Sequence, residues 1–170
     1  MNLDLGYGWN TLVDDTDQTS TFIRVETNLE PHRKVNMSLN YSIAWLKETD
    51  EPSGRDQRGS FHGLWAPTRT LSMQANLYFT DKTGRRDDST FLQDYSLNWS
   101  PFPDGTMQFS LSYNESRSTE GQIIKLLTPS VKWQVSRNIF VEASYSTGTI
   151  ESATEIVDTD NYRCNLRVVY

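Results

Sequence analysis

The sequence predicts an all-β chain of about ten antiparallel strands connected up and down, and alternation is the first observation that indicates it. From residue 35 to residue 45, one face carries Val, Met, Leu, Tyr, Ile and Trp, and the other carries Asn, Ser and Ala. A period of two is typical of a strand with one apolar and one polar face. Residues 101–105, Pro-Phe-Pro-Asp-Gly, then illustrate the turn chemistry that separates such stretches.

An internal repeat is the other observation behind this fold class. Four large apolar residues recur at the same place in the pattern, about 34 to 36 residues apart: Leu29, Trp65, Trp99 and Trp133. A period of this length indicates one supersecondary unit per repeat, here a strand, a tight turn, a second strand and a longer loop. The repeat therefore predicts a single domain of hairpins over residues 1–170.

The first five strands are predicted in chain order from the alternation. Residues 1–13 alternate Leu, Tyr and Trp with Asn, Asp and Gly, and residues 23–29 alternate Ile, Val and Leu with charged and amide residues. Residues 35–45 show the clearest pattern, and residues 71–79 repeat it. The strand at 58–66 has a weaker pattern and is predicted from its place in the repeat.

The last five strands follow by the same argument, at residues 90–100, 107–114, 123–135, 139–146 and 162–170. Pro129 lies inside the eighth strand, where it predicts a bulge or a weakened ladder, because proline has no N–H to donate. No helix is predicted. The strands would be joined alternately by tight turns and by long polar loops, the latter at residues 14–20, 47–57, 81–88, 115–122 and 151–160.

Composition excludes several classes of protein. No run of about 18 apolar residues is present, so a transmembrane helix is not expected. The net charge of −6 argues against nucleic-acid binding. The single cysteine, Cys164, excludes an internal disulfide and a multi-cysteine metal site, and we expect it to face lipid as a small apolar residue. The first residues have no basic region followed by an apolar core, so we expect a mature or excised chain without a signal peptide.

The two faces of the predicted sheet indicate its environment. The polar face carries mostly Ser, Asn and Gln rather than Lys and Glu, and its predicted lining residues are Asn36, Ser38, Asn40, Ser72, Gln74, Asn76, Gln108, Ser110 and Ser112. The apolar face has aromatic residues toward both ends, and the predicted interfacial anchors are Trp9, Trp45, Trp65, Trp99, Trp133 and Tyr170. An apolar outside, a polar inside and aromatic girdles are typical of a transmembrane β-barrel.

The chain thus resembles the outer-membrane β-barrel proteins of Gram-negative bacteria. The resemblance covers nearly the whole chain, and its most specific element is the end, Tyr162-x-Cys164-x-Leu166-x-Val168-x-Tyr170. That segment is similar to the C-terminal strand that the barrel assembly machinery recognises in this family. The resemblance implies an outer-membrane location, contact with the lipid bilayer, periplasmic tight turns and extracellular long loops.

Charged residues of the polar face are predicted to gather at a closure seam. They fall on the first two strands and on the last three, and the two groups would meet if the last strand paired with the first, because lipid cannot satisfy an open sheet edge. The predicted cluster consists of Asp4, Arg24, Glu26, Lys132, Glu142, Arg163 and Arg167, with Asp94 as an outlier. It would either fill and stabilise the barrel or act as a selectivity constriction.

The function predicted from these features is a porin-like passive channel for small solutes or ions, or a structural barrel. One alternative is that the chain forms the C-terminal hairpins of a larger porin, such as a barrel that sheathes cytochromes. A surface adhesion barrel whose loops bind a partner is another. No catalytic residue, metal site or cofactor is predicted, because His32 and His62 have no nearby Ser-His or Asp-His pattern and the paired aspartates at 14–15 and 87–88 lack calcium-loop spacing. The chain is therefore expected not to be an enzyme.

Overall fold

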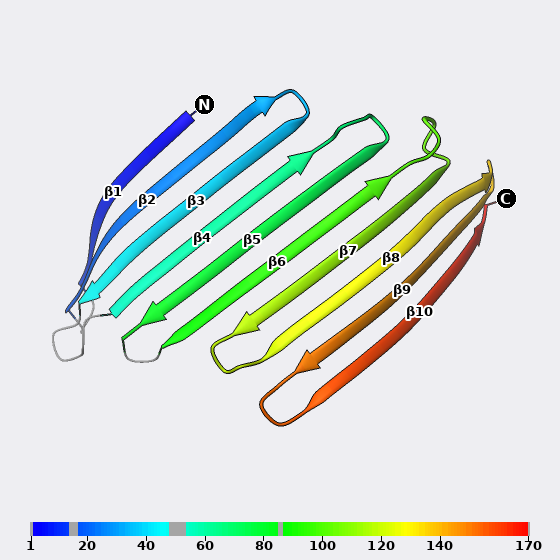
Figure 1. Cartoon of the computed structure of the whole chain (residues 1–170). Coiled ribbons are helices and arrows are strands. Elements are labelled where there is room, and N and C mark those ends of the chain that lie inside the picture. The colour runs from blue at the N-terminus through cyan, green and yellow to red at the C-terminus, as the bar shows by residue number, and fades with distance from the viewer. Residues whose placement is uncertain (1, 14–16, 48–53, 85–86, 170) are drawn as a thin grey trace.

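The fold is a single sheet of ten antiparallel strands, seen in a computed structural model that describes the backbone of residues 2–13, 17–47, 54–84 and 87–169 and side chains from residue 23 on, except 46–47 (Figure 1). The strand order across the sheet equals the order along the chain, so each strand pairs with the next one. The strands are β1 (Asn2–Val13), β2 (Asp17–His32), β3 (Val35–Lys47), β4 (Gly54–Trp65), β5 (Leu71–Thr83), β6 (Asp88–Trp99), β7 (Met107–Ser118), β8 (Ile123–Ser136), β9 (Ile139–Glu151) and β10 (Ile156–Val168).

At one end of the sheet, which we call the turn end, β3, β5, β7 and β9 begin at the predicted residues, whereas β2 continues to His32, beyond its predicted end at residue 29. There, Arg33 and Lys34 alone join β2 to β3, and residues 100–106 join β6 to β7. In that second turn, the Gly105 N–H donates to the Phe102 carbonyl at 3.1 Å, and Gly105 has a positive φ of 75°. This is a conformation that glycine adopts without the steric cost that a Cβ would add.

The opposite end of the sheet, which we call the loop end, differs from the prediction. Several strands extend into segments that were predicted to be long polar loops, namely β2, β5, β7, β9 and β10. The last two connections at this end are therefore short, at residues 119–122 and 152–155. The predicted difference in loop length between the two ends is therefore wrong for these connections. Polar residues continue the ladder because each pairs with a neighbouring strand, as Glu115 does with Lys125.

The ladder is regular in the middle of the sheet. Its register shifts lie near the turn end, between Leu29 and His32 and between Gln134 and Ser136. At Pro129 no bulge is found, but the pairing of β8 with β9 passes from Leu127 directly to Ser130 with an unchanged register. The predicted weakening of the ladder is thus confirmed, because proline removes one N–H donor from the ladder without displacing the strand.

The described side chains form no hydrophobic core, because the strands make a single layer of sheet. No hydrophobic side chain among those described is buried, and large apolar side chains are exposed on every strand from β2 to β10. A water-soluble domain covers its apolar face with a second layer. No helix that could cross a membrane occurs in the described part of the chain. Cover for the apolar face must therefore come from outside this sheet.

β1 and β10 form the two opposite edges of the curved sheet (Figure 1). No pairing between them is found among the described residues, so closure of the sheet is not detected. The all-β, antiparallel, up-and-down arrangement of the prediction is confirmed, whereas closure through a β1–β10 seam stays a prediction. In lipid both edges need a hydrogen-bonding partner.

Candidate functional site: the two faces of the sheet

The apolar face has an aromatic border at each end. At the turn end, Trp65, Trp99 and Trp133 are exposed, and the Trp99 ring stacks on Phe109 across β6 and β7 with centroids 5.4 Å apart. Trp45 is exposed toward the loop end. The Trp9 side chain and Tyr170 lie outside the part of the chain that is described, so their predicted role as anchors stays untested.

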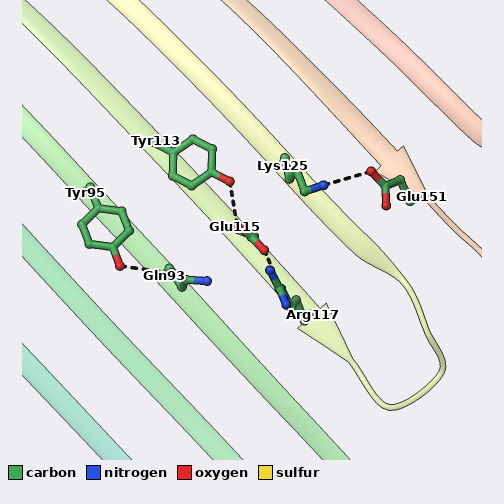
Figure 2. Close-up of polar contacts among 7 residues, drawn as sticks. All are labelled: Gln93, Tyr95, Tyr113, Glu115, Arg117, Lys125 and Glu151. Atoms are coloured by element: carbon green, nitrogen blue, oxygen red, sulfur yellow. Dashed lines mark hydrogen bonds and ion pairs between the residues drawn. The ribbon is translucent and has the colours of Figure 1, made fainter.

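Tyrosine hydroxyl groups mark where the apolar face ends on the loop side (Figure 2). Tyr113 donates to the Glu115 carboxylate at 2.6 Å, and Arg117 donates to the other oxygen of the same carboxylate. On the neighbouring strand, Tyr95 donates to Gln93 at 3.0 Å. Tyrosine places an apolar ring and a polar tip at a lipid–water boundary, so this line fits the outer limit of an apolar belt.

Beyond the tyrosines the same face becomes charged. Lys125 on β8 lies 2.9 Å from Glu151 on β9 (Figure 2), and Arg55 on β4 lies 3.4 Å from Asp81 on β5. Glu115 is the only buried polar residue among those described, with 7% of its surface exposed. The loop-end extensions of the strands therefore present an ion-paired surface that suits water rather than lipid.

The polar face carries cross-strand hydrogen bonds between small side chains. The register places all nine predicted lining residues on this one face. Ser110 and Ser130 share a hydrogen bond of 2.6 Å between their hydroxyl groups, and Asn40 donates to the Ser60 hydroxyl at 3.3 Å. Such pairs satisfy polar groups across strands and leave free space above the sheet. That this space is a lumen stays a prediction.

A row of three polar residues crosses β4, β5 and β6 on the same face. The Asn76 side-chain oxygen lies 2.5 Å from His62 Nδ1, and the Asn76 amide donates to the Asp94 carboxylate at 3.5 Å. No partner was predicted for His62, because a cross-strand neighbour is distant along the chain. Register, rather than a local motif, brings these groups together.

The predicted charge cluster is divided between two places. Lys132 and Glu142 lie 3.4 Å apart and line a cavity of about 570 Å³ at the turn end, together with Arg167. Arg24 and Glu26 line a separate cavity of about 340 Å³ on β2–β5. That both groups form one cluster stays a prediction, because it requires β10 to pair with β1, and no such pairing is found among the described residues. Arg163 lies on β10 opposite Ser144, and the Asp4 side chain lies outside the described ones.

The polarity of both faces reverses toward the loop end, which was not predicted from the sequence. On the polar face there, four apolar side chains stand among the polar ones: Tyr78, Leu92, Ile124 and Leu126. A signal for this reversal exists in the sequence. Two consecutive large apolar residues break the period of two at residues 78–79, 91–92, 123–124 and 126–127.

Comparison with solved structures gives three matches with TM-scores above 0.5, all of them OmpT, an outer-membrane protein of Vibrio cholerae. The in-vitro folded trimer form has a TM-score of 0.54 at 9% identity and covers 98% of this chain and 60% of its own. OmpT expressed in the outer membrane has a TM-score of 0.52 at 10% identity, and the match covers 96% of this chain and 60% of the OmpT chain. The variant lacking loop L8 has a TM-score of 0.51 at 9% identity, and the match covers 96% of this chain and 58% of the variant. This chain has the fold of an outer-membrane β-barrel protein.

The outer-membrane fold agrees with the predicted Gram-negative resemblance and supports a location in the bacterial outer membrane. The chain spans about 60% of the length of the OmpT chains that it matches. No protein-family model matches the sequence, and no curated protein does. The likeness is therefore one of fold.

The expectation that this chain is not an enzyme is corrected by the OmpT comparison. That expectation rested on the absence of a Ser-His or Asp-His pattern near the two histidines, but a fold shared at 9% identity fixes no side-chain chemistry. His62 is also not isolated, since it contacts Asn76. The absence of catalysis does not follow from this fold.

Proposed function

We propose that the chain forms a porin-like passive channel for small solutes or ions, with the polar face as its wall. The single observation that carries this proposal is the register, which collects nine Ser, Asn and Gln residues on one face behind a continuous apolar face. Small neutral side chains leave room for water and bind no ion strongly. Both properties are required for passive flow.

The charges of the polar face would set the preference of the channel. The turn-end cavity is lined by three positive residues, Lys132, Arg137 and Arg167, and by one negative residue, Glu142. Charged side chains that line a constriction favour ions of the opposite sign. We therefore propose a weak anion preference at the turn end.

Conductance in planar lipid bilayers tests the channel. Two adjacent cysteine variants, Ser112→Cys and Leu111→Cys, provide a matched pair in a Cys164→Ala background, because the two positions face opposite sides of β7. A cationic methanethiosulfonate reagent should reduce the current of Ser112→Cys and leave that of Leu111→Cys unchanged. Absence of current, or equal sensitivity of both variants, would contradict the proposal.

A second candidate is that these strands form part of a larger porin wall. The observation that favours it is the sheet itself, whose edges β1 and β10 lie apart. A double variant, Asp4→Cys with Arg167→Cys in the Cys164→Ala background, distinguishes the two arrangements in membranes. A disulfide within one chain would indicate a closed barrel of ten strands, and its absence would indicate that each edge pairs with other strands.

The C-terminal strand is also proposed to be the segment that the barrel assembly machinery binds. β10 is exposed along its whole length, and Tyr162 and Leu166 are among its most exposed side chains. An exposed edge strand can pair with a strand of a partner. Replacing both residues with Ser should slow assembly in the outer membrane, measured as the fraction of protein resistant to protease in cells.

A further inference from the structure

An apolar patch lies where the polar face approaches the loop end. Its six residues come from five strands, and each is between 38% and 40% exposed: Tyr78, Leu92, Ile124, Leu126, Ile150 and Val157. Register makes the patch nearly continuous, since Tyr78 pairs with Leu92, and Ile124 pairs with Ile150, which pairs with Val157. The wall of an aqueous channel is normally polar, so this patch is a departure that the channel proposal does not explain.

A cavity of about 420 Å³ lies against this patch and joins it to the polar row below. Four of the apolar residues line the cavity, together with Asn76, Asp94 and Asn114. The volume lies within the range of small-molecule sites. The patch is therefore part of a concave site rather than a flat surface.

The charge of the cavity selects among possible occupants. Asp94 lines it, and among the described residues this carboxylate has no cationic partner, only the long hydrogen bond from Asn76. Glu115 also borders the cavity, but its carboxylate is bound by Arg117 on the opposite face. On the far side of Tyr78, the charge of Arg58 is balanced by Asp56 at 2.6 Å. The free charge of the site is thus negative.

We propose that this cavity binds amphiphilic cations, in which a compact apolar body carries an ammonium group. The apolar body would lie against Leu92 and Leu126, and the ammonium group would lie beside the Asp94 carboxylate. This inference rests on the proposed function in one respect, because the cavity is open to solutes only if the polar face borders water. It adds a substrate class to that function.

Calorimetric titration of the protein in zwitterionic lipid nanodiscs tests the site, with empty nanodiscs as the blank. Benzyltrimethylammonium should bind about tenfold more tightly than tetramethylammonium, which lacks the apolar body, and than benzenesulfonate, which has the opposite charge. Leu126→Ser should weaken binding of benzyltrimethylammonium about tenfold. Asp94→Asn should remove the preference over benzenesulfonate.

Leu64→Ser is the matched control, because Leu64 is an exposed leucine of the same face outside this cavity. It should leave binding unchanged. The site would be overturned by equal affinity for the three probes, by no binding, or by an equal loss of affinity in Leu64→Ser. Occupation of the cavity by a segment of the chain itself would also overturn it. Binding needs no current, so a protein that binds but does not conduct would refute only the channel, whereas one that conducts but does not bind would refute only the site.

Discussion

Arginine placed at Leu111 or at Ser112 should have very different effects, although the two positions are adjacent on β7. Leu111 lies two residues from Tyr113, at about 3.4 Å per residue, so it is about 7 Å along the strand from the tyrosine boundary. A strand tilt of about 40° makes this about 5 Å of depth in the apolar belt. An arginine costs about 2–4 kcal/mol at the bilayer midplane and about 0–1 near the interface. We therefore expect Leu111→Arg to lower the free energy of unfolding by about 2 kcal/mol.

Ser112→Arg should change the free energy of unfolding by less than about 0.5 kcal/mol, because its side chain would enter water. The measurement is equilibrium unfolding by denaturant of protein folded into lipid vesicles, with both variants studied in the same lipid. Equal losses would refute the assignment of the two faces. A larger loss at Ser112 would show that the assignment is inverted.

Three further outcomes follow from contacts on the apolar face. Glu115→Gln should lower the free energy of unfolding by about 1–2 kcal/mol, because it removes the charge that binds a tyrosine and an arginine, whereas Glu155→Gln in an exposed connection should be neutral in the same assay. Gly59→Ala should cost about 1 kcal/mol, because a Cβ there would lie 2.0 Å from the Phe79 ring, which must move; a cost that persists in a Phe79→Leu background would count against this cause. Cys164 should react slowly with a membrane-impermeant maleimide in intact vesicles, and rapid labelling would place it in water instead.

The turn end of this fold could be predicted closely from the sequence. Four strands begin there at the predicted residue: Val35, Leu71, Met107 and Ile139. Proline, glycine and short polar dipeptides end the ladder there for local reasons of backbone geometry, and local reasons are visible in a single sequence. The Lys132–Glu142 contact could also be predicted from the sequence, because the two residues flank one tight turn.

The loop end could not be predicted as closely. Residues such as Glu115 and Arg117 look like loop residues because polar side chains are usual in loops, yet they continue the ladder opposite Lys125 and Ile123 on the adjacent strand. Whether a polar stretch is strand or loop depends on the hydrogen-bonding partner beside it. That partner is decided by register, which the stretch itself does not contain.

The sequence by itself determined the number of strands, their order as hairpins and which residues share a face, because alternation and turn chemistry act between near neighbours along the chain. Only the tertiary structure decided where the apolar belt ends at the tyrosine line, which apolar residues gather beside Asp94, and that β1 and β10 stand at opposite edges. These features depend on contacts between residues distant in sequence, set by the register and curvature of the whole sheet.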